Sequence, residues 1–150
     1  MKKFSIIILI FFIYGCGYTS IYKYQNQDLL INVKNTKGDI EMNNFIKNEI
    51  KISSNNNSQN IFNIDFETEY KKITLVKDST GKATDYKLDL KVIFTILSEG
   101  NKQLTLTENF KIKDNTQNFE QNNYEKEIKR NFSKNIKDKL ISSLLKINDN

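Results

Sequence analysis

The chain contains no histidine, one cysteine and only five glycines in 150 residues, and these shortages exclude several kinds of chemistry. Without histidine there is no imidazole to act as a general base, and zinc sites built from cysteine and histidine are unavailable. The single cysteine, Cys16, cannot form an internal disulfide. Gly81 and Gly100 stand alone in predicted turns, so there is no glycine-rich phosphate-binding loop. We therefore expect a protein that is not an enzyme and that holds no metal or cofactor.

The charged residues do not indicate a catalytic or nucleic-acid-binding site either. Asp65, Glu67 and Glu69 could form a carboxylate pair, but they alternate with apolar residues and so fit the solvated face of a strand better. Lysines are interspersed with acidic residues, which argues against a nucleic-acid surface. Proline and tryptophan are absent while asparagine, lysine and isoleucine abound, a bias that we attribute to A+T-rich coding.

The longest apolar run, Phe4–Tyr14, is interrupted only by Ser5 and is too short to cross a bilayer, which needs about 20 residues. Lys2 and Lys3 precede it and the small Gly15 follows it. This arrangement is typical of a secretory signal peptide.

Residues 13–16 (IYGC) resemble the lipobox, the recognition site of lipoprotein signal peptidase, although Tyr14 is bulkier than the residue usual there. We therefore expect residues 1–15 to be a removable export signal. Cys16 would then be the first mature residue and carry S-diacylglycerol and an N-acyl chain, which consumes the only thiol. The alternatives are an ordinary signal peptide followed by a chance cysteine, or a short uncleaved anchor.

The mature chain is long enough for one domain. Without Lys2 and Lys3, 21 basic residues remain against 18 acidic ones, so the net charge is a modest +3. Residues 16–28 are polar with several tyrosines and are predicted to be a lipidated tether. Residues 29–150 are predicted to form a single domain.

The first half of this domain begins with a strand at 29–33 and a helix at 40–52. Asp39 is suited to cap this helix, whose apolar residues recur at helical spacing: Met42, Phe45, Ile46 and Ile50. Residues 53–60 are a loop by composition.

Three segments then show the alternation of half-buried strands, at 62–70, 86–96 and 104–112. The alternation slips at Lys71–Ile73, which predicts a bulge or bend. Turns are predicted at 77–83 and 98–102, so these strands form antiparallel hairpins.

Residues 113–123 are predicted to be a polar loop, and residues 124–147 a long helix with an apolar residue every fourth position. The order is therefore β-α-β-β-β-α. An apolar sheet face with two amphipathic helices to cover it predicts an α+β two-layer sandwich, with a four-stranded, mostly antiparallel sheet.

This order resembles the LptE family of lipopolysaccharide-assembly lipoproteins. The mature start, Cys16-Gly17-Tyr18, is similar to the family's cysteine-glycine-aromatic opening. The segment Thr84–Glu99 (TDYKLDLKVIFTILSE) resembles its central strand. The segment Asn118–Ile147 (NFEQNNYEKEIKRNFSKNIKDKLISSLLKI) resembles its polar loop and C-terminal helix.

The resemblance implies an outer-membrane lipoprotein on the periplasmic side that plugs the LptD β-barrel, assists its assembly and helps deliver lipopolysaccharide to the cell surface. Gly17 is consistent with an outer-membrane location, because no aspartate follows Cys16 to retain the protein at the inner membrane. A strand face suited to a polar barrel lumen is formed by Asn63, Asp65, Glu67, Thr68, Glu69, Lys87, Asp89 and Lys91. The alternatives are a stand-alone lipid-binding lipoprotein or a structural envelope lipoprotein.

The most basic stretch lies around the turn at residues 71–87. We hypothesise that Lys77 and Lys82 contact the phosphates of lipopolysaccharide. Asp78 and Asp85 partly cancel the positive charge, so the alternative is an ordinary solvated turn with no ligand.

Overall fold

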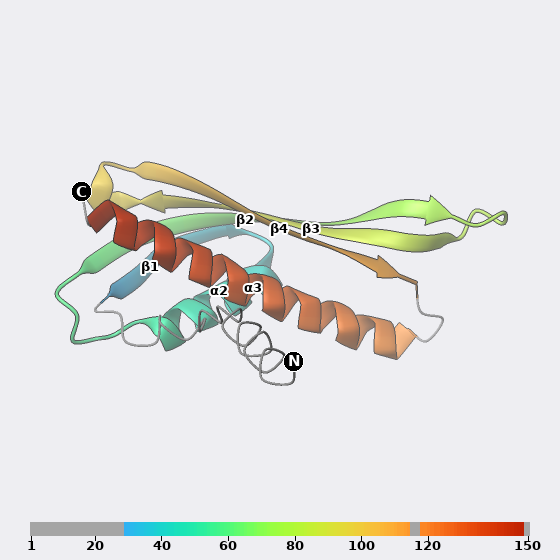
Figure 1. Cartoon of the computed structure of the whole chain (residues 1–150), viewed down its shortest axis with the longest axis horizontal. Helices are drawn as coiled ribbons and strands as arrows, with labels where there is room; N and C mark the ends of the chain where they lie inside the picture. The colour runs from blue at the N-terminus through green and yellow to red at the C-terminus, as the bar shows by residue number, and fades with distance from the viewer. Residues whose placement is uncertain (1–28, 115–117, 149–150) are drawn as a thin grey trace, which may run out of the picture.

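The computed structural model describes residues 29–114 and 118–148, which form one sheet with two helices packed against it (Figure 1). The elements in chain order are β1 (Leu30–Gly38), α2 (Ile40–Ser53), β2 (Ile61–Lys77), β3 (Ala83–Ile96), η3 (Leu97–Glu99), β4 (Lys102–Lys113) and α3 (Asn118–Asn148). None of the helices in these ranges has the length and apolar character needed to cross a membrane.

The four strands lie in the order β1-β2-β3-β4. β1 runs parallel to β2, with α2 as the crossover between them, whereas β2, β3 and β4 are consecutive antiparallel strands. Both helices lie on the same side of the sheet, and no α-helix of the described residues covers the other side (Figure 1). The predicted α+β sandwich and its element order are therefore confirmed.

A compact junction joins β1 to α2. Gly38 has φ +93°, which lets the chain turn beside the backbone of Thr68. Asp39 caps α2 as predicted, because its carboxylate accepts a hydrogen bond of 2.8 Å from the Met42 amide. The Asp39 amide donates to Thr68 Oγ1 (3.0 Å), and Thr68 Oγ1 in turn donates to Asn43 Oδ1 (2.8 Å). This junction fixes the start of α2 against β2.

The position of Thr68 differs from the prediction, which was the strand face away from the core. Thr68 is only 3% exposed, and its partner across the sheet is the fully buried Val92. A threonine suits either face of a strand. Here its hydroxyl is satisfied by the buried Asn43, which makes the buried position favourable.

The core lies between the helix-covered face of the sheet and the two helices. The alternation predicted for β2 and β3 is confirmed, and the Phe66 and Phe94 rings meet with centroids 5.4 Å apart. The largest fully buried side chains come from α2, β2, β3 and α3: Phe94, Met42, Ile46, Ile50, Ile64, Leu88, Leu90, Ile96, Ile136, Leu140, Leu144 and Val92.

The slip at Lys71–Ile73 is not a bulge. β2 pairs regularly with β3 from Glu69 to Thr74, and the register shifts only at Val76 and Lys77. The pairing of β1 with β2 ends at Thr68, so residues 71–77 of β2 extend beyond the core. Its side chains are exposed on both faces, which is why the apolar alternation is lost there.

α3 begins at Asn118, so the predicted loop at 113–123 is too long. The first turns of the helix are polar and give no apolar periodicity. The predicted four-residue repeat holds further along, where buried side chains face the sheet: Ile128, Phe132, Ile136, Leu140 and Leu144. Lys139 ties the helix to the β4 edge through the Glu108 carboxylate and the Thr107 carbonyl.

Candidate functional surface: the projecting hairpin and the helix-free face

The hairpin of β2 and β3 extends beyond the rest of the sheet (Figure 1). The pairing of β1 with β2 stops at Gly38 and Thr68, whereas β2 and β3 remain paired as far as Lys77 and Ala83. The pairing of β4 with β3 ends at Asp85. The far end of the hairpin is therefore a narrow two-stranded arm.

Lys77 and Lys82 both lie at the tip of this arm and are exposed. Asp78 organises the turn between them, because one of its carboxylate oxygens accepts hydrogen bonds from the Thr80 hydroxyl and from the amides of Thr80 and Lys82. The Thr80 hydroxyl is the main reason that the pKa of Asp78 is lowered. Lys82 Nζ lies 3.3 Å from Asp114 Oδ2. Of the two predicted lysines, only Lys77 makes no ion pair with the described residues.

A network of polar contacts that the sequence does not predict joins the base of the arm to both helices. The Glu125 carboxylate on α3 accepts hydrogen bonds from the Tyr70 hydroxyl and from Lys72 Nζ, each 2.8 Å long. Lys129, one helical turn later, bonds to Glu41 of α2 at 2.8 Å. No local pattern could have revealed this network, because Tyr70 and Glu125 are 55 positions apart.

The ionisation of this network is set by burial and pairing. Burial alone would raise the pKa of Glu125, but hydrogen bonds from Lys72 and Tyr70 and the positive charges of Lys72 and Lys129 lower it overall. Burial, followed by the hydrogen bond to Glu125, raises the pKa of Tyr70 well above its ordinary value. Tyr70 is therefore a fixed hydrogen-bond donor and unsuited to acid–base catalysis at neutral pH.

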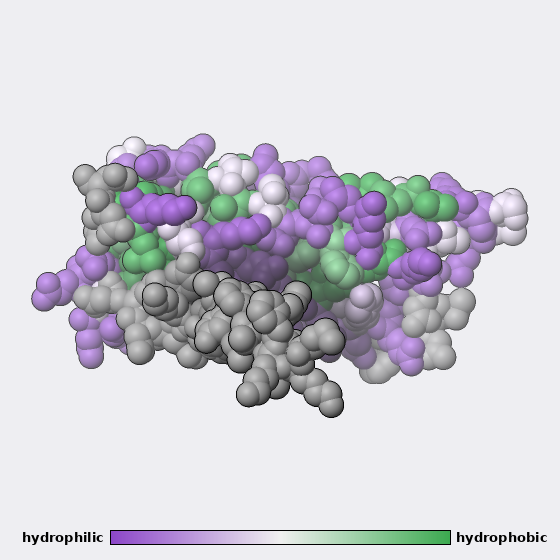
Figure 2. Space-filling model, in the orientation of Figure 1, coloured by the Kyte–Doolittle hydropathy of each residue, from purple (hydrophilic) through white to green (hydrophobic). Residues whose placement is uncertain are grey.

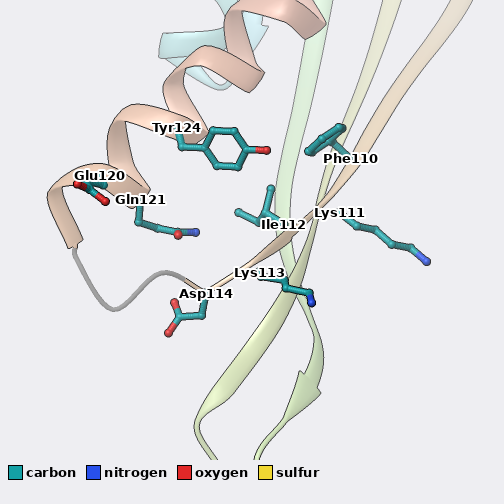
Figure 3. Close-up of a pocket in the computed structure, with 8 residues that line it drawn as sticks. All are labelled: Phe110, Lys111, Ile112, Lys113, Asp114, Glu120, Gln121 and Tyr124. Carbon is teal, nitrogen blue, oxygen red and sulfur yellow. The ribbon is translucent and has the colours of Figure 1, made fainter.

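An open hollow of about 680 Å³ lies between β4 and the first turns of α3. Figure 3 shows the Tyr124 ring directed from α3 toward Phe110 and Ile112 of β4, while Lys111 points away. Phe110 is 44% exposed and Tyr124 is 47% exposed. Phe110 belongs to the alternating segment 104–112 and Tyr124 begins the four-residue repeat of the helix predicted at 124–147, so the sequence places both on apolar faces. They remain open because α3 diverges from the sheet here (Figure 1).

The helix-free face of the sheet is mostly polar across β2, β3 and β4, as predicted except for Thr68, with Ile73 and Ile93 among the polar residues. Opposite charges face each other across strands in the pairs Glu69–Lys91 and Lys71–Asp89. On β2, β3 and β4 the acidic and basic side chains of this face are equal in number: Asp65, Glu67, Glu69, Asp85 and Asp89 against Lys71, Lys87, Lys91, Lys111 and Lys113. Lys37 of β1, which pairs with Glu67, adds one positive charge. The face is thus highly charged but close to neutral in sum.

Apolar side chains interrupt the polar surface at several places, one of them along the projecting part of the β2–β3 hairpin (Figure 2). On β2 these are Ile73, Leu75 and Val76, each at least 40% exposed. Within residues 29–114 and 118–148, no three histidine, cysteine, aspartate or glutamate residues come together in a way that could hold a metal. Cys16, the predicted lipidation site, lies outside the described residues.

No protein-family model and no curated protein sequence matches the chain. Its fold, however, is similar to those of several solved lipoproteins. Rare lipoprotein B from Shewanella oneidensis superposes with a TM-score of 0.54 at 14% identity, covering 80% of this chain and 98% of that protein. A putative lipoprotein from Caulobacter crescentus gives 0.52 at 8% identity, covering 76% and 86%.

A minor lipoprotein from Acinetobacter baumannii gives a TM-score of 0.51 at 17% identity, covering 77% of this chain and 92% of that protein. At identities this low, the similarity shows a shared fold only. Because the matched chains are covered almost completely, the shared fold is that of whole lipoprotein domains rather than of a fragment. The chain therefore has the fold of bacterial lipoproteins.

Proposed function

We propose that this chain is an outer-membrane lipoprotein of the LptE type, anchored on the periplasmic side by lipid on Cys16. In this proposal it plugs an LptD-like β-barrel, assists assembly of that barrel and supports delivery of lipopolysaccharide to the cell surface. The lipoprotein fold and the lipobox-like residues 13–16 support the anchor. It acts by binding and position, with no reaction and no cofactor.

The helix-free face carries this proposal. The lumen of a large outer-membrane barrel is polar and wet. A sheet face that is charged yet close to neutral in sum can lie against such a wall with few unpaired charges, because most of its charges compensate one another across the strands. Cross-strand neighbours such as Glu69 and Lys91 illustrate this compensation.

The closed core separates this proposal from a stand-alone lipid carrier. A carrier needs an enclosed apolar cavity for its ligand. Side chains such as Leu90, Phe94 and Leu140 between the sheet and the helices are 0% exposed. The hollow beside β4 and the hollow beside β1 are both open to solvent. The alternative is a structural lipoprotein with other envelope partners, and an experiment must distinguish it from the barrel plug.

Affinity purification of the tagged chain from detergent-solubilised membranes tests the proposal. We expect a very large outer-membrane β-barrel to be recovered in stoichiometric amount. An untagged strain is the matched control. Recovery of the chain with other envelope proteins and without any barrel would overturn the proposal in favour of a structural lipoprotein.

We also propose that Lys77 and Lys82 contact lipopolysaccharide phosphates from the tip of the arm. Lys77 supports this because its ammonium group makes no ion pair with the described residues, and the arm carries it away from the body of the protein. Replacing both lysines by glutamate should weaken lipopolysaccharide binding several-fold. The matched control replaces the exposed Lys102 and Lys126 in the same way. Equal binding by the two double variants would rule out the contact.

A further inference from the structure

A second basic surface lies at the end of the domain where the tether enters. It is formed by the outer side of α2 and the free edge of β1, around a shallow hollow of about 370 Å³. The hollow is lined by Leu30, Ile31, Asn32, Val33, Lys34, Lys47, Ile50, Lys51, Ser54 and Asn56. Lysines are the only charged residues in this lining. We call the set Lys34, Lys47 and Lys51 the tether-end lysines.

The tether-end lysines are exposed, and none of them forms an ion pair with the part of the chain that the structure describes. This distinguishes them from other lysines of the domain, such as Lys72 and Lys129, which are paired with acidic groups. Lys51 lies in the last turn of α2, where a positive charge favours the helix. Lys47 lies one turn earlier, and like charges at this spacing mildly destabilise a helix, so folding stability does not explain Lys47.

The same side of α2 continues the pattern towards its first turn. Ile40, Asn44, Lys47 and Lys51 recur at spacings of four, three and four residues, so they share one face of the helix. All four are exposed, and Ile40 is 77% exposed. The apolar side of α2 is buried in the core, so this exposed face could meet a membrane only at its surface, where lysines with no acidic residue among them are attracted to anionic headgroups.

The position of this surface in the chain also favours an anionic membrane surface as its binding partner. β1 begins at Leu30, which lines the hollow, and residues 16–28 join it directly to Cys16. Thirteen residues span at most roughly 45 Å when fully extended. A lipid on Cys16 would therefore hold the tether-end lysines within reach of headgroups at a high effective concentration, at which weak contacts become useful.

We propose that the tether-end lysines dock this end of the domain on the anionic phospholipid headgroups of the leaflet that holds the lipid anchor. The inference rests on the proposed anchor at Cys16. The projecting arm lies at the opposite end of the molecule from the start of β1 (Figure 1). Docking through the tether end therefore sets the direction in which the arm points, away from the leaflet surface.

The test uses the chain from residue 16 onward with Cys16→Ser, so that no acyl chain contributes to binding. Cosedimentation is measured with vesicles of phosphatidylethanolamine alone and with vesicles that also contain phosphatidylglycerol. We expect binding only to the anionic vesicles, and its loss at high salt. The triple variant Lys34→Gln, Lys47→Gln, Lys51→Gln should bind at least tenfold more weakly, since each lysine near an anionic surface contributes roughly fivefold.

The matched control makes the same charge change at exposed lysines away from the hollow, with Lys102→Gln, Lys126→Gln and Lys134→Gln. It should bind within about threefold of the parent chain. Thermal unfolding of both variants confirms that they are folded. Equal losses in the two variants would reduce the effect to net charge and overturn the proposal.

Two further outcomes also overturn the proposal. One is no binding of the parent chain to anionic vesicles. The other is unchanged vesicle binding by the tether-end variant together with loss of its protein partner from the affinity purification, which would assign the surface to an acidic protein segment. Incorporation of labelled fatty acid into the wild-type chain is measured separately. Failure of the anchor and failure of the docking surface are thus distinguishable.

Discussion

Replacing Gly38 by alanine should destabilise the domain strongly, because two independent costs coincide at this position. The backbone has φ +93°, a conformation that costs a residue with a side chain about 1–2 kcal/mol. The new Cβ would also lie 1.9 Å from the Thr68 carbonyl oxygen, far inside contact distance. Neither atom belongs to a mobile side chain, so β1 or β2 must move.

That movement would disturb the hydrogen bonds that hold the junction. The Asp39 amide donates to Thr68 Oγ1 at 3.0 Å, and Thr68 Oγ1 donates to Asn43 Oδ1 at 2.8 Å. A net loss of about 0.5–1.5 kcal/mol for each bond adds to the backbone strain. We expect Gly38→Ala to lower the free energy of unfolding by about 2–5 kcal/mol, a large part of the stability of a typical domain.

Gly81→Ala is the matched control, because Gly81 has φ +84° but no atom within 4 Å of the position of its Cβ. It should lose only the strain term, about 1–2 kcal/mol at most. Urea unfolding followed by circular dichroism measures both variants. Equal losses in the two variants would refute the reasoning, since they would show that the close approach of Gly38 to Thr68 has no energetic consequence.

Three further perturbations probe the packing and the polar contacts. Thr68→Val leaves the buried Asn43 oxygen without its donor and should cost about 1–3 kcal/mol in urea unfolding; a neutral result would show that the bond is dispensable. The lowered pKa of Glu125 implies stability that is present above the pKa of the unfolded chain and is lost as pH falls through the folded value. Glu125→Gln should therefore lose less stability than the wild type between pH 7 and pH 3, and parallel pH profiles would contradict this. Leu140→Ala should cost about 2–5 kcal/mol because Leu140 is fully buried, and a loss below 1 kcal/mol would place it outside the core.

The sequence predicts the elements of this fold well wherever one face of an element is buried. The alternation in β3 and the four-residue repeat in α3 both follow from contact with a single core. Asp39 was identified as a cap because the capping bond depends only on neighbouring residues. The patterns fail where the core ends: along the projecting part of β2, and in the polar first turns of α3 that begin at Asn118.

The polar contacts across the fold could not be predicted in the same way. Thr68 is compatible with either strand face, and only its contact with Asn43 decides which one it occupies. The bond between Tyr70 and Glu125 depends on where α3 crosses β2, which no local pattern encodes. Phe110 was expected in the apolar face, but the divergence of α3 from the sheet leaves it half exposed. Cys16 stays a prediction, because it lies outside the described residues.

The most direct test of the central claim is crosslinking from the helix-free face in intact cells. A photoreactive residue at Thr107, exposed on that face of β4, should crosslink to a very large outer-membrane β-barrel. The same residue at Asn56, in the loop beside the tether end, is the reference position. The account predicts a barrel adduct from Thr107, stronger than from Asn56. Efficient labelling of other envelope proteins from Thr107, with no barrel adduct, would contradict it.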